Sequence, residues 1–166
     1  MTYYFAYGSN MNPDRVQARI GSTKRVLAGV LPDHALSFNK ASRIPGIAHA
    51  NVVHQPGSQV EGALFQLADA AQVELMDPFE GVPHDYQRQR KAILTSLGTI
   101  DAWVYIAVPE RIRPGLKPAR EYLDHLLAGR PFLSDSYHRQ LSQVDVVEGL
   151  DDAVLTMLGL SRHSPR

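Results

Sequence analysis

Glu80 is the residue whose sequence surroundings best fit acid–base chemistry. It follows a segment of helical periodicity that ends near Asp77, so its carboxylate would face the negative end of a helix dipole. The carboxylate of Asp77 and the apolar neighbours Phe79 and Val82 would act in the same direction. All three effects raise the pKa of a carboxyl group toward the range useful for proton transfer. The alternative is a solvated loop glutamate, because most glutamates are exposed.

A second candidate is the turn formed by Gly8, Ser9 and Asn10, which ends an aromatic, strand-forming run. Asn12 is a suitable helix N-cap, and Pro13 suits the first helical position. A turn that leads into a helix presents backbone N–H groups at its positive end, where an anion or a carbonyl oxygen can bind. The alternative is an ordinary strand-to-helix turn whose polar groups only satisfy the backbone.

Other chemistries find little support in the sequence. The seven histidines form no metal-binding motif, and His49 and His54 would lie on opposite faces of one strand. There is no cysteine, and therefore no thiol nucleophile and no disulfide, which fits a cytoplasmic setting. Ser9 is not in a G-x-S-x-G elbow, and no phosphate-binding P-loop is present.

Composition predicts one globular domain over residues 1–166, with 44% hydrophobic and 20% charged residues. Lys plus Arg equals Asp plus Glu at 17 each, which argues against a nucleic-acid partner bound through a large basic surface. No signal-peptide pattern is visible at the N-terminus, and no apolar run approaches the ~20 residues that span a bilayer. We expect a cytoplasmic protein without a membrane partner, and the sequence leaves open a monomer or a homodimer.

The expected elements must bring Glu80 and the N-terminal turn together. Periodicity predicts helices over 13–20, 69–77, 118–128 and 134–143, with a weaker helical pattern over 151–160. Strands are expected at 26–31, 35–39, 47–54, 60–67, 86–95 and 100–108, with turns at 32–34, 55–58 and 96–99. Gly62 suggests a bulge or a close backbone contact. Residues 109–118 are expected to form a loop, and 162–166 a frayed end. This order predicts an α+β fold with a mixed, strongly curved sheet.

Two motifs resemble the γ-glutamylcyclotransferase-like family, which includes the AIG2-like proteins. The first is Tyr4-Phe5-Ala6-Tyr7-Gly8-Ser9-Asn10, similar to the family's substrate-binding loop. The second is Glu80-Gly81-Val82 followed by Tyr86, similar to the segment that carries the family's catalytic acid/base. The resemblance implies a small β-barrel with flanking helices. It also implies Glu80 as the catalytic residue, and Tyr86 and Tyr122 as residues that orient the substrate or support Glu80.

The reaction implied by the resemblance converts a γ-glutamyl amide into 5-oxoproline and a free amine or amino acid. It requires no metal and no organic cofactor, and its partner is a small-molecule γ-glutamyl substrate. Two alternatives stay open: removal of a γ-glutamyl protecting group from a larger metabolite, and a non-catalytic binding module of the same fold. Pro78 and Phe79 stand where polar residues are expected, and the proline-rich loop 109–118 could reshape the leaving-group side.

Overall fold

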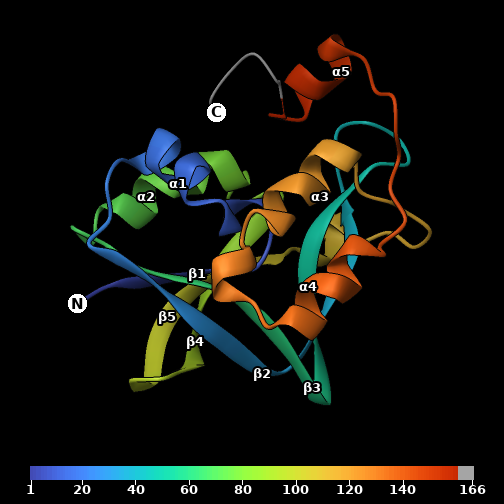
Figure 1. The fold of residues 1–166 in the computed structure, drawn as a ribbon. Coiled ribbons are helices and arrows are strands. Elements are labelled where there is room, and N and C mark those ends of the chain that lie inside the picture. The colour runs from blue at the N-terminus through green and yellow to red at the C-terminus, as the bar shows by residue number, and fades with distance from the viewer. Residues whose placement is uncertain (161–166) are drawn as a thin grey trace.

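Five strands form a closed barrel in the computed structural model, which describes residues 1–160 (Figure 1). The strands are β1 (Tyr3–Ala6), β2 (Arg25–Ala41), β3 (Ala48–Gln66), β4 (Tyr86–Thr95) and β5 (Gly98–Ala107). They follow one another around the barrel as β1-β3-β2-β4-β5. The pairing of β1 with β5 is parallel and closes the barrel, whereas the other pairs are antiparallel. The expected α+β fold with a small, mixed barrel is confirmed.

β2 and β3 form one long hairpin, and the expected interruptions at 32–34 and 55–58 are wrong. Asp33 has a positive φ of 59° at a register shift in β2, so this residue makes a bulge instead of a turn. In the facing part of β3, Gly57 has a φ of 86° and donates its backbone N–H to Asp33 Oδ1 at 3.1 Å. Turn-forming residues therefore serve as paired irregularities inside continuous strands.

Helices lie outside the barrel, and Figure 1 shows α1 and α2 beside each other over one end of it. The α-helices are α1 (Pro13–Ile20), α2 (Gln72–Met76), α3 (Arg120–Leu127), α4 (Asp135–Ser142) and α5 (Asp152–Met157). Short 3₁₀ helices are η1 (Ser9–Met11), η2 (Asp77–Glu80), η3 (Pro109–Arg111) and η4 (Arg130–Phe132). Asn12, Ser134 and Asp151 cap α1, α4 and α5 through their side chains, as these residue types favour.

Several boundaries differ from the expected ones. Pro118 does not open α3, because the helix begins at Arg120 and residues 118 and 119 pair with the segment at Val147. The hairpin of β4 and β5 turns within 96–97, which is tighter than expected. The loop at 109–118 contains η3 and otherwise lacks a helix or strand, and the expected frayed end at 162–166 lies outside the described residues. Within residues 1–160, no helix is long and apolar enough to cross a bilayer.

Close packing at Gly62 connects β1 to β3. A Cβ atom at this position would lie 2.3 Å from the backbone oxygen of Ala6 and 2.9 Å from the ring of Phe5. Phe5 itself is fully buried in the barrel core. The expected close backbone contact is therefore confirmed, and it fixes the strand that leads directly into the Gly8 turn.

Candidate functional site

A pocket of about 490 Å³ opens between the turn after β1, the start of α1 and the segment that follows α2. The predicted site residues that line it are Tyr4, Phe5, Tyr7, Gly8, Ser9, Asn10, Glu80, Tyr86 and Tyr122. Ala6 is the exception, because it is buried in β1 opposite Ala63 and does not belong to the lining. The fold thus brings Glu80 to the N-terminal turn across a long stretch of sequence.

Glu80 is the last residue of η2, and that short helix is fixed to the barrel by Asp77. Asp77 accepts two hydrogen bonds from the guanidinium of Arg88, at 2.8 and 3.0 Å, and one from the hydroxyl of Tyr105 at 2.7 Å. After Glu80 the chain turns at Gly81, whose φ is +63°. The carbonyl oxygen of Gly81 accepts the backbone N–H groups of His84 and Asp85. The position of the carboxylate is therefore set by backbone and side-chain contacts on both sides.

Helical structure does not stop at Pro78 as the sequence suggests. It continues as η2 through Glu80, because proline is tolerated in the first turn of a helix. Glu80 therefore lies within the last helical turn and not beyond a helix end. Phe79 is 51% exposed and packs its ring under the guanidinium of Arg19 at 4.9 Å. The apolar residue before Glu80 thus faces outward and contacts a cation at the pocket.

The pKa of Glu80 is raised, mainly because its surroundings desolvate the carboxylate. The residue as a whole is only partly buried, since it lines the pocket. Arg19, Arg15 and Lys40 oppose the increase, in that order, and the negative charge of Asp77 adds to it. Desolvation and the neighbouring carboxylate act as the sequence suggests. The three cations come from α1 and β2, which are distant from Glu80 in the sequence.

The turn at Gly8 is held by α1 and by β1. Asn10 donates from Nδ2 to the hydroxyl of Tyr4 at 2.9 Å, and Arg19 lies 3.5 Å from Asn10 Oδ1. The guanidinium of Arg15 donates to Ser9 Oγ at 3.3 Å. A Cβ atom on Gly8 would lie 3.0 Å from the hydroxyl of Tyr122. The turn is thus packed closely, and glycine lets α3 approach it.

Tyr86 and Tyr122 bind the backbone of the same residue of β3, Ala50, through their hydroxyls. Tyr86 donates to the carbonyl oxygen of Ala50 at 2.6 Å, and Tyr122 accepts the N–H of Ala50 at 2.9 Å. Burial raises the pKa of Tyr122 to about 12, while hydrogen bonds from the backbone of Ala50 and Ser9 oppose this increase. Both tyrosines are therefore neutral at physiological pH, and their hydroxyls support the pocket wall.

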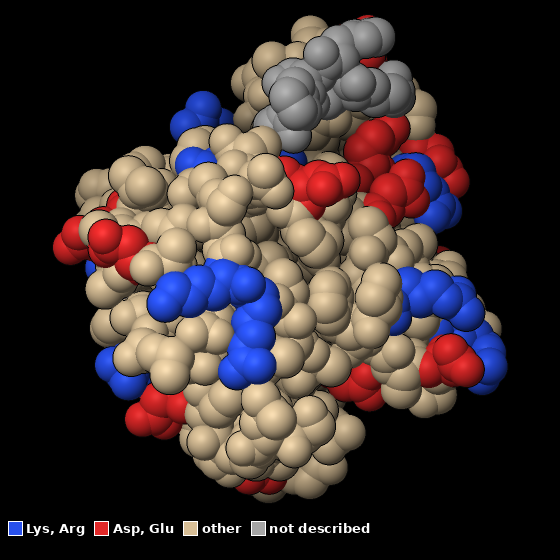
Figure 2. Space-filling view, turned by 60° about the vertical axis from the view of Figure 1, so that its left-hand side comes forward, with Lys and Arg blue, Asp and Glu red and all other residues tan. Residues whose placement is uncertain are grey.

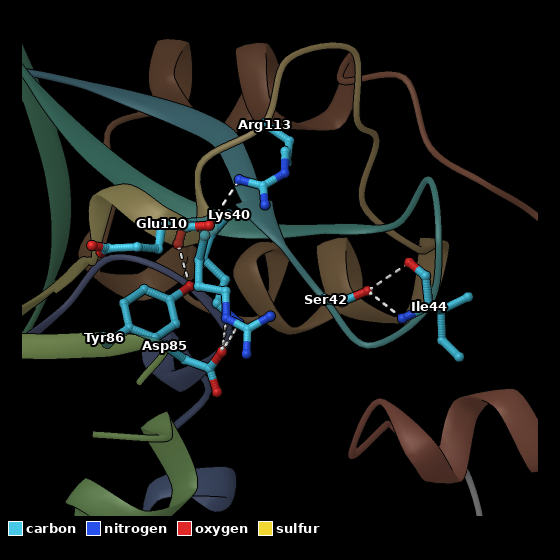
Figure 3. A network of polar contacts seen from close by, with 9 residues as sticks. Lys40, Ser42, Ile44, Asp85, Tyr86, Glu110 and Arg113 are labelled. Carbon is cyan, nitrogen blue, oxygen red and sulfur yellow. Dashed lines mark hydrogen bonds and ion pairs between the residues drawn. The ribbon is translucent and has the colours of Figure 1, made fainter. Parts of the chain in front are cut away.

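Basic side chains are the part of the pocket that the sequence argument missed. Arg15 and Arg19 are four residues apart on α1, a spacing that places them on one face, and this signal was available. The others are Lys40, Arg43 and Arg111. Lys40 Nζ lies 3.2 Å from Asp85 Oδ1, and the guanidinium of Arg111 approaches the same oxygen at 3.1 Å. Figure 3 shows Lys40 and Asp85 pointing toward each other. Burial lowers the pKa of Lys40, and Asp85 opposes this.

His49 also lines the pocket and was not predicted to do so. Its ring lies 4.9 Å from the ring of Tyr122, and burial lowers its pKa to about 3. His49 is therefore a neutral residue of the wall at physiological pH. No group of three or more His, Cys, Asp or Glu side chains suited to a metal ion occurs within residues 1–160.

Comparison with solved structures finds the same fold elsewhere. A protein named gamma-glutamyl cyclotransferase superposes with a TM-score of 0.79 at 20% identity, covering 95% of this chain and 98% of its own. An uncharacterized human protein, loc79017, gives 0.78 at 20% identity with the same coverage. YkqA from Bacillus subtilis gives 0.72 at 19% identity, covering 88% of this chain and 56% of its own. No curated protein sequence matches the chain.

The sequence itself carries the family pattern over most of its length. The model of the family described as gamma-glutamyl cyclotransferase, AIG2-like, matches residues 4–129. This range contains both motifs, the strands of the barrel apart from Tyr3 of β1, and all of α3. The chain therefore belongs to the AIG2-like γ-glutamyl cyclotransferase family.

Proposed function

We propose that the protein converts a γ-glutamyl amide into 5-oxoproline and a free amine or amino acid. This is the specific form of the cyclotransferase-like activity that the family and the fold indicate. The observation that carries the proposal is the meeting of Glu80 with the Gly8–Asn10 turn in one pocket. The ligand of this pocket would be a small γ-glutamyl compound.

The proposed reaction is an intramolecular aminolysis. The α-amine of the substrate attacks its own γ-carbonyl carbon, a new C–N bond closes the five-membered ring, and the original amide C–N bond breaks. The α-ammonium must first lose a proton, and the carboxylate of Glu80 is the base that takes it. As the ring forms, the attacking nitrogen loses a second proton. Glu80 transfers the two protons one after the other to the departing nitrogen, so the amine leaves as an ammonium and the enzyme ends in its initial state.

Two features of the pocket support this assignment. Ring closure requires a folded substrate, and an enclosed pocket gains rate by holding the reacting groups in contact. The backbone of the Gly8 turn and the guanidinium groups of Arg15 and Arg19 offer partners for the α-carboxylate and for charge that develops on the carbonyl oxygen. A raised pKa at Glu80 brings the base closer to the working pH, which favours proton transfer in both directions.

Glu80→Gln tests the proposal directly. Glutamine keeps the size of the side chain but cannot accept the ammonium proton, so single-turnover release of 5-oxoproline should fall by about 10²–10⁴. Substrate affinity should fall much less, because the turn and the arginines are unchanged. Glu74→Gln is the matched control, since Glu74 is exposed on α2 and lies outside this pocket. Full activity in Glu80→Gln would refute the assignment.

The alternative activities predict different results in the same experiments. Binding of γ-glutamyl compounds without any release of 5-oxoproline from the wild type would support a non-catalytic binding module. Release that occurs only from large γ-glutamyl conjugates would support removal of a protecting group. Release from small γ-glutamyl amides supports the proposed function.

A further inference from the structure

The C-terminal segment is a wall of the pocket, although the family model ends at residue 129. Thr156, Met157, Leu158 and Gly159 all belong to the lining. They come from the end of α5 and the residues that follow it. Figure 1 shows α5 set apart from the barrel, reached by an extended stretch of chain after α4. A segment outside the barrel thus closes one side of the site.

This wall is anchored to the rest of the protein at two places, and its helix is capped from within the segment. Leu155, Leu158 and Leu160 are buried in the hydrophobic core, and Asp151 accepts the N–H of Val154 at 2.9 Å to cap α5. At the other end, Arg15 donates from Nη1 to the carbonyl oxygen of Gly159 at 2.9 Å. The same guanidinium donates to Ser9 Oγ at 3.3 Å. Arg15 therefore ties the end of the segment to the turn that the substrate is proposed to contact.

Thr156, Met157 and Gly159 all line the pocket and are exposed, and Met157 is the large apolar side chain among them, 55% exposed. Lining residues that are also exposed mark the mouth of a pocket, whereas the buried tyrosines Tyr4, Tyr7 and Tyr122 mark its inner end. In the proposed reaction, the γ-glutamyl group occupies the inner end near Glu80. The leaving group then extends toward the mouth, where the exposed lining residues include Met157, Phe79 and Arg43.

We propose that the segment 152–159 forms the leaving-group wall of the pocket, with Met157 as the residue that limits the size of the leaving group. The inference rests on the proposed function, because the term leaving group has meaning only for that reaction. A methionine suits such a place, since its flexible, polarizable side chain can adapt to groups of different shape. Selectivity among leaving groups would then come from this segment and not from the barrel.

Met157→Trp and Met157→Ala test the inference with substrates that differ only in the leaving amino acid. We would measure kcat/KM for γ-glutamyl-glycine and γ-glutamyl-tyrosine. The affinity for each compound would be measured in double variants that combine Glu80→Gln with each substitution of Met157. In an apolar pocket, one methylene group more or less changes the discrimination between two substrates by about 10–200-fold. Met157→Trp should therefore lower the tyrosine-to-glycine ratio of kcat/KM by about 10-fold or more. Met157→Ala should raise that ratio.

Leu97→Trp is the matched control, because Leu97 is also exposed but lies at the tip of the β4–β5 hairpin, outside the pocket. It should leave both substrates unaffected. Equal effects of Met157→Trp on both substrates would overturn the inference while the proposed function stands. Size-selective binding without 5-oxoproline release would overturn the proposed function. The segment 152–159 would then still select ligands by size, but not leaving groups. Absence of both binding and release would overturn both.

Discussion

The surroundings of Glu80 act on its charge in two opposite directions. Desolvation raises its pKa, while Arg19, Arg15 and Lys40 oppose the increase. Such a balance is common at functional sites, where a group is held in a state that costs stability. The carboxylate of Glu80 is thus available as a base at the expense of folding free energy.

This balance predicts a pH-dependent stability difference between the wild type and Glu80→Gln. Because the pKa of Glu80 is higher in the folded state, the folded chain binds more protons than the unfolded chain between the two pKa values. The free energy of unfolding of the wild type therefore falls as the pH rises from the ordinary glutamate pKa of about 4.3 through the raised value, because the desolvated carboxyl group becomes charged. Glu80→Gln should show the higher Tm at pH 7, and the difference should shrink below pH 4. A wild type with the higher Tm at pH 7 would contradict the desolvation argument.

At this scale the sequence predicts the desolvated carboxylate but not its counter-charges. Asp77 is a neighbour of Glu80 in the chain, so its effect on the pKa can be anticipated. By contrast, Phe79, expected to desolvate the carboxylate, faces outward and packs on Arg19. Lys40 reaches the site only because β2 runs along the barrel to the pocket, and Arg15 and Arg19 do so because α1 follows the turn at Gly8. The spacing of Arg15 and Arg19 shows that they share one face of α1, but no local pattern shows that they and Lys40 meet Glu80.

Among the elements, η2 and the turn after it position the site most directly. Gly81 lies between Glu80 and Asp85, the carboxylate that pairs with Lys40 and Arg111 at the pocket. Its left-handed φ of +63° is one reason for glycine, and close contact with Asp85 is another. A Cβ atom at Gly81 would lie 2.2 Å from Asp85 Oδ2. Asp85 pairs with Lys40 and Arg111, so a side chain at position 81 that displaced Asp85 would also disturb these two basic residues.

Gly81→Ala should therefore lower both stability and activity. Strain at a left-handed residue costs on the order of 1 kcal/mol or more, and the clash with Asp85 adds to it. Gly115→Ala is a matched control, because Gly115 has a φ of +73° but nothing within 4 Å of the added Cβ. Denaturant unfolding should show the larger loss for Gly81→Ala, which should also lose 5-oxoproline release. Equal losses of stability in the two variants would show that the contact with Asp85 contributes nothing.

The elements also show where local signals mislead. Pro32-Asp33 and Pro56-Gly57 have the composition of turns, yet they lie inside β2 and β3. The two irregular positions face each other and share the hydrogen bond between Gly57 and Asp33. The strands on either side of them therefore stay paired. By contrast, α1 and α4 begin where their capping residues predict. Caps depend on a few adjacent residues, whereas long strand pairing depends on the partner strand.

Over the whole molecule, charge is balanced in total but not in the pocket. The chain has 17 basic and 17 acidic residues, and Figure 2 shows both kinds interspersed on one face. Among the described residues that line the pocket, five are Lys or Arg and two are Asp or Glu. The closed barrel could be predicted from the family resemblance. The local excess of positive charge in the pocket could not be predicted from the balanced composition. It favours an anionic substrate through focused electrostatic attraction.

Arg43 offers the clearest test of that attraction, because it is exposed and lines the pocket, and Arg43→Gln should not disturb the fold. An exposed charge contributes about 0.2–1 kcal/mol, so kcat/KM for γ-glutamyl-glutamate should fall by about 1.5- to 5-fold. For γ-glutamyl-methylamide, which has no net charge, the change should be smaller. Arg139→Gln is the control, since Arg139 is exposed on α4 and outside the pocket.

Added salt should reproduce the effect of Arg43→Gln in the wild type. Screening at 1 M ionic strength shortens the Debye length to about 3 Å, so attraction from exposed charges at the mouth is largely lost. We expect kcat/KM for γ-glutamyl-glutamate to decline as KCl is raised, more steeply in the wild type than in Arg43→Gln, with little decline for the methylamide. Equal salt dependence for the two substrates would mean that the basic residues do not attract the leaving group. They would then act only on the γ-glutamyl part, which both substrates share.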